Sequence, residues 1–315
     1  MHFVLLLFCF TQAFAVAIVR EETSDGSWLE ARINDDRTLG GLIFSDGSSV
    51  IYDYEDARLQ KITRLDSLGR EIYSQSCTWK DSRLENQAAW FNTQYFYDDN
   101  GRVIARLNPW HNEVIEYDTQ GQAVRIGDRT YCYDHLRQIT AEHGFFEALY
   151  GTDYNIEELN EKSFCPHQTN DFQYDKNSQL VEAFGKRYSY DLYGRCIRKG
   201  GTSYLYLGFE EIASFEEGLC KTLKIPGLGG PVAIEIDGKP YAPIVDAQGV
   251  VRKLIDPMNN SIYAENHCDV FGNGLTEEIP YAYRGKRYDE ETNLLYFGKR
   301  YYNPASHQWL TPDPL

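Results

Sequence analysis

The sequence predicts an all-β protein in which short antiparallel hairpins repeat along most of the chain. Tyrosine supplies 24 of the 315 residues, and it suits half-buried strands because its hydroxyl group can reach water or a polar partner. A Tyr-Asp-x-x-Gly-Arg motif recurs, and its composition is typical of a hairpin turn. Residues 281–315 alternate aromatic and basic residues around Asn, Asp and Pro breaks, which predicts two strands and a third short segment.

The charge balance limits the kinds of partner. The chain has 31 Lys and Arg residues against 47 Asp and Glu residues, a net charge of −16. Such a chain repels phosphate backbones and anionic membrane surfaces, so we expect no nucleic-acid partner. The ordinary interpretation of the acidic surface is solubility. The length allows one large domain or two ordinary ones.

The N-terminus has the layout of a cleavable secretory signal. The apolar run Phe3–Phe10 is too short to span a bilayer, and small residues follow at alternate positions from Ala13 to Ala17. We therefore predict a signal peptide over residues 1–17 and a protein that is secreted or held in the cell envelope, with no membrane segment after signal removal. The alternative is a first buried strand, since His2 is the only basic residue before the run.

Six cysteines lie beyond the predicted signal. An even number in an exported chain permits disulfides, but the spacings are wide and show neither a C-x-x-C motif nor a metal-finger pattern. We expect packed free thiols rather than a disulfide framework, and no metal site. The six are Cys77, Cys132, Cys165, Cys196, Cys220 and Cys268.

Residues 18–50 are predicted to form N-terminal strands and turns, and a repeat region follows over residues 51–240. The clearest copies of the repeat begin at Tyr97 and Tyr190, and they start 16 to 20 residues from the copies beside them. Each unit can therefore supply about two short strands and two turns. Degenerate or shortened copies begin at Tyr54, Leu65, Trp79, Tyr117, Tyr133 and Tyr174.

Each motif residue has a predicted role in a turn. Asp98 and Asp191 begin the turn, where the carboxylate can accept backbone N–H bonds, and Gly101 and Gly194 take the positive-φ position. The following Arg opens the returning strand with its charge toward solvent. Because the aspartates recur in register, we interpret them as turn formers and not as catalytic groups.

The repeat lapses in an insertion over residues 143–172. Ile156 and Leu159 are spaced as on a helix, with acidic residues early and Lys162 late, so we predict a short surface helix there. His143, Cys165 and His167 flank it without a tight ligand spacing, and we expect no metal. The later Gly-rich loop at residues 226–231 leads into a strand rather than a helix, which excludes a phosphate-binding loop.

Common enzyme motifs are absent from the sequence. It has no G-x-S-x-G, H-E-x-x-H, Walker or dinucleotide motif. The seven histidines are scattered singly, and a nucleophile paired with a distant histidine stays open because such partners meet in space. We expect no enzyme activity and no cofactor.

Two segments near the C-terminus carry a family resemblance. Residues 246–256 and 269–273 read DAQGVVRKLID and DVFGN, and GKRYDEETNLLYFGKRYYNP with TPDPL follows. This order of motifs resembles the Rhs repeat-associated core of Rhs and YD-repeat proteins, a family that includes polymorphic toxins, insecticidal toxin-complex C components and teneurin-like YD-shells. The resemblance spans about residues 52–315, with residues 241–315 as the core. It implies a hollow shell, partial or complete, around a C-terminal toxin.

The resemblance also implies self-cleavage by two aspartates that share a proton. The first position falls on Asp289, and the second falls on Asn303, an amide that cannot act as a base. Asp313 is the remaining acidic candidate, and the family's scissile segment would follow Leu315, where this sequence ends. We therefore expect no autoproteolysis, and a structural role for Asp289 in a turn beside Arg287 or Arg300.

We predict an exported structural shell protein that encloses or presents a C-terminal toxin-like polypeptide, fused or separately encoded. The alternative is an extracellular module that binds a surface glycan or protein. Its stacking platforms would be exposed aromatic residues. A self-cleaving shell of the aspartyl type is the third hypothesis. The candidate platforms are Trp79, Trp90, Trp110 and Trp309.

Overall fold

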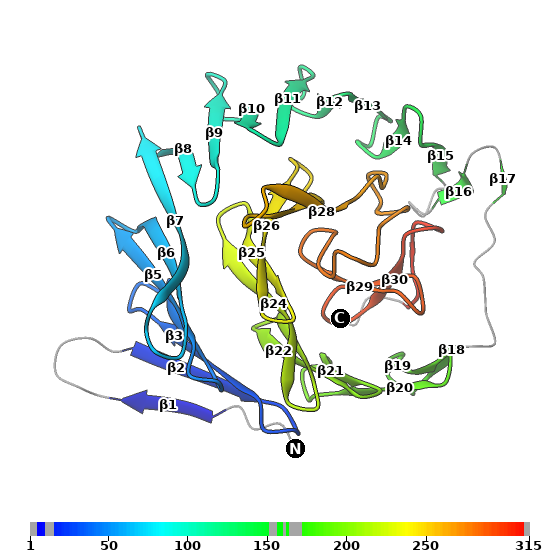
Figure 1. The fold of residues 1–315 in the computed structure, drawn as a ribbon. Helices are drawn as coiled ribbons and strands as arrows, with labels where there is room; N and C mark the ends of the chain where they lie inside the picture. The colour runs from blue at the N-terminus through cyan, green and yellow to red at the C-terminus, as the bar shows by residue number, and fades with distance from the viewer. Residues whose placement is uncertain (1–4, 10–15, 151–155, 160–161, 164–171, 312–315) are drawn as a thin grey trace. The chain divides into compact units, whose positions relative to one another are not determined.

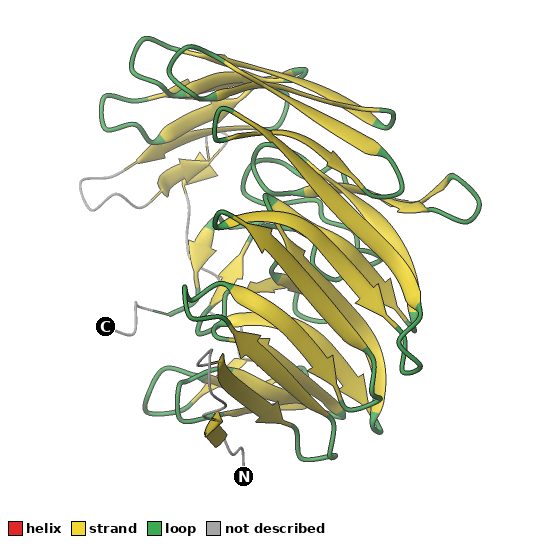
Figure 2. Cartoon of the chain, turned by 90° about the vertical axis from the view of Figure 1, so that its left-hand side faces the viewer, coloured by secondary structure: helices red, strands yellow, loops and turns green. Residues whose placement is uncertain are grey.

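The computed structural model describes residues 5–9, 16–150, 156–159, 162–163 and 172–311, and all regular structure in these residues is β-strand (Figures 1 and 2). They form 32 strands, and strands that follow one another in the chain pair antiparallel, as in β2–β3, β22–β23 and β29–β30. The prediction of an all-β chain of antiparallel hairpins is therefore confirmed. Within these residues, no helix exists that could cross a membrane.

The chain divides into two compact units, each made of two chain segments. Unit 1 comprises Met1–Asn92 and Lys186–Ala242, and unit 2 comprises Thr93–Gly185 and Pro243–Leu315. The strands that lie in unit 1, the last of which runs on into unit 2, are β1 (Leu5–Cys9), β2 (Val16–Glu22), β3 (Trp28–Ile33), β4 (Leu39–Phe44), β5 (Ser49–Glu55), β6 (Arg58–Leu65), β7 (Glu71–Lys80), β8 (Arg83–Ala88), β20 (Lys186–Tyr190), β21 (Cys196–Lys199), β22 (Thr202–Leu207), β23 (Glu210–Glu216), β24 (Leu219–Gly227), β25 (Gly230–Ile236) and β26 (Lys239–Val245).

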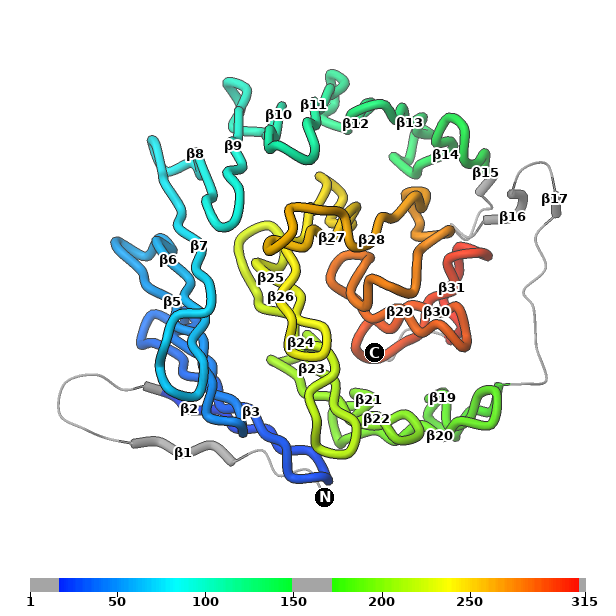
Figure 3. Tube along the Cα trace, viewed as in Figure 1, coloured from blue at the N-terminus to red at the C-terminus, as the bar shows by residue number. Residues whose placement is uncertain are grey.

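The core of unit 1 lies between two sets of hairpins, β2–β8 and β20–β26, which Figure 3 shows as the blue-to-cyan and the green-to-yellow parts of the trace. The period-two pattern of strands places alternate residues inside, so that Val50 and Tyr52 are buried while Ile51 between them is exposed. Leu42 and Ile62 from the first set share one apolar cluster with side chains of the second, which are Leu205, Ile212, Ala213, Phe215, Leu223, Ile225, Val232 and Ala233.

Unit 2 carries the central repeats and the C-terminal core. Its strands, the first of which begins on the last residue of a unit 1 segment, are β9 (Asn92–Tyr97), β10 (Val103–Asn108), β11 (His111–Tyr117), β12 (Ala123–Ile126), β13 (Arg129–Tyr133), β14 (Ile139–Glu142), β15 (Phe146–Tyr150), β16 (Ile156–Leu159), β17 (Lys162–Ser163), β18 (Phe172–Tyr174), β19 (Leu180–Ala183), β27 (Val251–Asp256), β28 (Ser261–Glu265), β29 (Arg287–Asp289), β30 (Leu294–Tyr296), β31 (Tyr301–Asn303) and β32 (Gln308–Trp309).

One turn geometry recurs in both units. In the copy at Asp98, the Asp98 N–H donates to the Arg102 carbonyl (2.9 Å) and the Gly101 N–H donates to the Asp98 carbonyl (3.0 Å), while Gly101 has φ +81°. This is a type I turn followed by a bulge residue in the left-handed region. The same pair of backbone bonds begins at Asp66, Asp118, Asp134, Asp175, Asp191, Asp246 and Asp269.

The side chains of the motif close the turn on itself. The Asp98 carboxylate accepts the Arg102 N–H (2.8 Å) and the Arg102 Nε–H (2.7 Å). Asp191 accepts the same two bonds from Arg195, which is 3% exposed. The expectation that the motif arginine points to solvent is therefore wrong for Arg195, because its guanidinium satisfies the buried Asp191 and Glu21 carboxylates.

The predicted surface helix is also wrong where the structure describes it. Ile156–Leu159 forms strand β16, which pairs with β15 through Tyr150↔Ile156 and Ala148↔Leu159. Two apolar residues three apart fit either structure, and here the pairing strand supplies the backbone hydrogen bonds. Cys165 and His167 lie outside the described residues.

At the N-terminus, the described backbone of Leu5–Cys9 pairs with β2, from Leu5↔Arg20 to Cys9↔Val16. This is the arrangement that the alternative interpretation, a first strand, predicts. The secretory signal stays a prediction, because pairing in the uncleaved chain does not test cleavage.

Candidate functional site

The candidate site is residues 243–315 of unit 2, which we call the C-terminal core, together with the polar contacts that hold them on strands β9–β19, which we call the repeat strands. Val250, Cys268, Tyr283, Leu295 and Tyr302 form its apolar cluster. These residues come from the 246–250 turn, the 266–283 connection and the small β29–β32 sheet. The C-terminal aromatic stretch is therefore part of a packed interior and not an exposed tail.

Asp289, the first position implied for self-cleavage, ends β29 opposite Leu294. Its side chain is fully buried, and its Oδ2 lies 3.9 Å from Arg287 Nη1. Its carbonyl accepts the Thr292 N–H (3.3 Å), which closes the turn to β30. The Asp289 carboxylate therefore lies at the β29–β30 turn, close to the Arg287 guanidinium.

Asn303, the second implied position, lies two strands further on, in β31. Its Oδ1 accepts the N–H groups of Ala305 (3.0 Å) and Ser306 (3.3 Å), so the amide caps the turn to β32. Strand β30 lies between β29 and β31, which separates the two backbones by about 10 Å at ordinary strand spacing. Asp313 lies outside the described residues.

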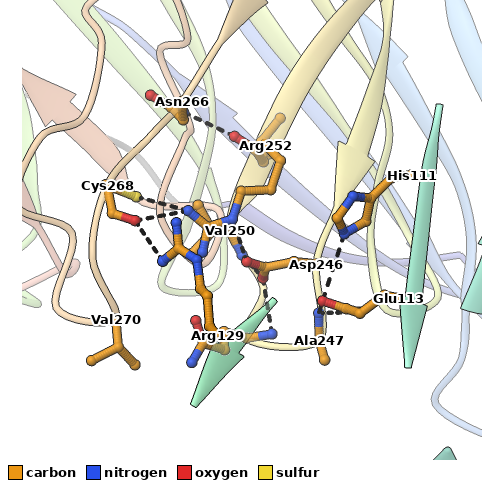
Figure 4. Close-up of polar contacts among 12 residues, drawn as sticks. His111, Glu113, Arg129, Asp246, Ala247, Val250, Arg252, Asn266, Cys268 and Val270 are labelled. Atoms are coloured by element: carbon orange, nitrogen blue, oxygen red, sulfur yellow. Dashed lines mark hydrogen bonds and ion pairs between the residues drawn. The ribbon is translucent and has the colours of Figure 1, made fainter. Parts of the chain in front are cut away.

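Two carboxylates on the repeat strands bind backbone N–H groups of the C-terminal core. Glu113 on β11 accepts the Ala247 N–H (3.0 Å; Figure 4). Glu142 on β14 accepts the Val270 N–H (2.6 Å). Ala247 and Val270 are the second residues of the Asp246 and Asp269 turns. Each of these turns is thus fixed by a carboxylate more than 100 residues earlier in the chain.

Two arginines complete this network, which we call the anchoring network (Figure 4). Arg129 Nη1 donates to Glu142 Oε1 (2.7 Å) and to the Cys268 carbonyl (2.8 Å). Arg252 donates through Nε to Asp246 (2.5 Å) and through Nη1 to the same Cys268 carbonyl (2.9 Å). One guanidinium from a repeat strand and one from the core therefore share a single carbonyl oxygen.

Burial sets the proton affinities of this network. It raises the pKa of Glu142 above its ordinary value, against the lowering effects of the Val270 N–H and Arg129. Burial also raises the pKa of the Cys268 thiol to about 11, so the thiol stays protonated at neutral pH. A neutral thiol is a weak nucleophile, and the network is suited to holding the core rather than to chemistry on it.

His307 fastens the β31–β32 turn to the same region. Its ring packs on Phe271 with centroids 4.2 Å apart and meets Phe146 edge-on at 5.4 Å. Its Nε2 lies 3.6 Å from the Asp269 carboxylate. The C-terminal hairpin is thereby held against β15 and the Asp269 turn.

The sequence also raised the possibility of disulfides and of a metal site. Five of the six cysteines beyond the predicted signal are free thiols, of which Cys77, Cys196 and Cys268 are buried. Among the residues that the structure describes, no three His, Cys, Asp or Glu side chains are grouped to hold a metal ion.

The sequence alone does not reveal the anchoring network. The Asp246 and Asp269 turns were recognisable, since D-x-x-G at these positions repeats the hairpin motif. Their partners on β11, β13 and β14 carry no comparable signal, because a single Glu or Arg in a strand usually faces solvent.

Solved structures of toxin complexes contain a similar architecture. No family model matches the chain. The structure resembles a Photorhabdus luminescens Tc holotoxin pore, with a TM-score of 0.53 and 14% identity over 96% of this chain and 22% of that one. It also resembles a TcdB2–TccC3–Cdc42 complex, with a TM-score of 0.52 and 14% identity over 95% of this chain and 22% of that one. The chain therefore has the fold of part of these toxin structures.

The sequence similarities point the same way and are weak. The tRNA3(Ser)-specific nuclease WapA of Bacillus spizizenii is 27% identical over 67% of this chain and 8% of its own length. Teneurin-m of Drosophila melanogaster is 22% identical over 70% and 8%, and Teneurin-1 of Homo sapiens is 24% identical over 73% and 10%. The chain spans about a tenth of these relatives, and the similarity supports the resemblance to Rhs and YD-repeat proteins.

Proposed function

We propose that the chain is the shell part of an exported Rhs/YD-repeat protein, and that it encloses or presents a toxin-like polypeptide that follows it or is encoded separately. The observation that carries this proposal is the anchoring network. A polypeptide attached beyond β32 starts from a core that buried contacts of Glu113, Glu142 and Arg129 fix on the repeat strands. Likeness to part of a Tc holotoxin supports a toxin as the enclosed partner.

The chemistry of the relatives is not part of this proposal. WapA is named as a tRNA nuclease, but this chain corresponds to 8% of that protein. A net charge of −16 opposes binding of RNA phosphates. We propose a structural role for this chain, and any toxic activity would belong to the enclosed polypeptide.

Protection of an appended polypeptide tests the role. The full chain is fused at its C-terminus to an unstructured, protease-sensitive tail, and its digestion is compared with that of the same tail fused to an unrelated β protein. An enclosing shell should slow cleavage of the tail at least tenfold while both carriers stay intact. Equal digestion rates contradict enclosure, and failure to bind the tail added as a separate chain would then contradict presentation as well.

A second function is favoured by one observation, the exposed aromatic group at β32. Trp309 is 42% exposed, Arg300 stacks over its ring at 4.2 Å, and Phe297 meets it edge-on at 5.0 Å. Such a platform can stack on a sugar ring or a partner side chain. Trp79 instead donates its Nε1–H to the Leu59 carbonyl, and Trp90 and Trp110 are half-buried.

A glycan array separates this binding function from the shell. Loss of a binding signal in Trp309→Ala, with binding retained in Trp110→Ala, would support an extracellular binding module. No signal from the wild-type chain, or an equal signal from Trp309→Ala, counts against it.

A further inference from the structure

A cavity of about 410 Å3 lies in unit 1. Its size is within the range of pockets that take small organic ligands. The hairpins β4–β5, β6–β7, β23–β24 and β25–β26 surround it. The residues that line it are Phe44, Ser45, Asp46, Ser48, Arg64, Asp66, Ser67, Ile72, Phe215, Gly218, Leu219, Cys220, Leu223, Glu235 and Gly238.

The cavity is mostly apolar, and part of its apolar lining is open to water. Phe44, Phe215 and Leu223 are buried, whereas Ile72 is 46% exposed and Leu219 is 66% exposed. Large apolar side chains at the surface are usually scattered singly, but these two line one hollow. A ligand with an apolar body would remove this surface from water, at about 25 cal/mol for each Å2 buried.

The charged groups deep in the cavity already have partners in the protein. Arg64 donates to Glu235 through Nε (2.9 Å) and Nη2 (3.2 Å), and through Nη1 to the Leu65 carbonyl (2.9 Å). The Tyr73 hydroxyl donates to Glu235 Oε1 (2.6 Å). The guanidinium is thus engaged by the buried carboxylate and the backbone, which disfavours it as a site for an anionic ligand.

One carboxylate of the lining favours a cation. Asp66 is ion-paired with Arg70 and Glu235 with Arg64, so these charges largely cancel. In the part of the chain that the structure describes, the Asp46 carboxylate accepts hydrogen bonds from Ser48 and forms no ion pair, so its charge is available to a ligand. The excess of negative charge over the whole chain adds to the repulsion of anions.

We propose that this cavity binds a small organic cation with an apolar body, such as an arylalkylamine. The apolar body lies against Phe44, Phe215 and Leu219, and the ammonium group lies near the Asp46 carboxylate. This proposal does not depend on the shell function, because every lining residue belongs to unit 1.

Two probes of similar shape and opposite charge test the proposal. Tryptamine and indole-3-propionate are titrated into the full chain by calorimetry. We expect tryptamine to bind at least tenfold more tightly, and Cys220→Phe, which adds a ring at the cavity wall, to abolish its binding without changing the circular dichroism spectrum. Equal affinities for the two probes, or unchanged binding to a folded Cys220→Phe variant, would overturn the proposal.

A matched pair of variants locates the charge that selects the cation. Asp46 caps its turn through the Ser48 N–H (2.9 Å) and hydroxyl (2.6 Å), and Asp36 caps the preceding turn in the same way through Thr38. An Asn side chain retains an acceptor oxygen at either position. Asp46→Asn should weaken tryptamine binding about tenfold and Asp36→Asn should leave it unchanged, whereas equal effects would contradict a site at the cavity.

Discussion

Replacing Glu142 by Ala should release the Asp269 turn from the repeat strands. The carboxylate is fully buried and accepts the Val270 N–H at 2.6 Å and an Arg129 N–H at 2.7 Å. An unsatisfied buried N–H costs about 1–3 kcal/mol, and loss of a charged hydrogen bond costs about 1.5–3 kcal/mol. Arg129 keeps its bond to the Cys268 carbonyl, so we expect a total of about 3–5 kcal/mol, the usual cost of breaking a buried ion pair.

Hydrogen exchange measured by mass spectrometry suits this prediction, because two units need not unfold as one. Amides of residues 264–275 should exchange roughly a hundredfold faster or more in Glu142→Ala, since each 1.4 kcal/mol corresponds to a factor of about ten. The control is Glu116→Ala, which breaks the exposed Glu116–Arg125 pair in the same unit and should change stability by less than about 1 kcal/mol. Unchanged protection in Glu142→Ala would refute the anchoring role.

Three local predictions and one about self-cleavage follow from the turns and the core. Gly194→Ala should lower the free energy of unfolding by about 1–2 kcal/mol in urea titrations, because Gly194 has φ +79°. Hydrogen bonds from Arg102 lower the pKa of Asp98 below its ordinary value of 3.8. The ionised carboxylate therefore stabilises the folded chain above pH 3.8, and this stabilisation is lost as the pH falls through the folded-state pKa. Asp98→Asn should therefore show a smaller acid-induced loss of stability. The Cys268 thiol, with a pKa of about 11, should resist iodoacetamide at pH 7.5 in the folded chain. A chain with a family-type tail should stay uncleaved on gels, and so should its Asn303→Asp variant, whose side chain would still cap Ala305 and Ser306.

Each of these has a control or a contradicting outcome. Gly201→Ala is the control for Gly194→Ala, because Gly201 has open space for a Cβ and no positive φ. An equal loss of unfolding free energy in the two variants would contradict the argument from φ. An equal acid-induced loss of stability in Asp98→Asn and in the wild-type chain would contradict the role of the Asp98 carboxylate. Cys132 is exposed and should be alkylated first, so faster labelling of Cys268 contradicts its burial. A tail released at the junction would disprove the absence of self-cleavage.

The local part of the fold could be predicted because the motif encodes its own turn. Asp98, Gly101 and Arg102 supply the carboxylate, the positive φ and the closing guanidinium within five residues. Hairpins and their order along the chain follow from such local contacts. The helix expected around Ile156 and Leu159 shows the limit, because strand pairing overrode a two-residue spacing.

The candidate site could not be predicted in the same way. Glu113 contacts Ala247 across 134 residues, and Glu142 contacts Val270 across 128. A buried carboxylate opposite a distant backbone N–H leaves no periodicity in the sequence. Arg195 shows the same limit within a recognised motif, because its burial depends on the carboxylate of Glu21 from the other segment of unit 1.

The split of unit 1 into two chain segments has a consequence for protein synthesis. Arg64 acquires its partner Glu235 only after 171 further residues, and Glu21 waits 174 residues for Arg195. At about 5–20 residues per second, ribosomes need roughly 10–35 s to supply them. During that time the early hairpins expose apolar faces and strand edges without their covering layer. The core of unit 1 therefore cannot close until the last hairpins of its second segment have been synthesised.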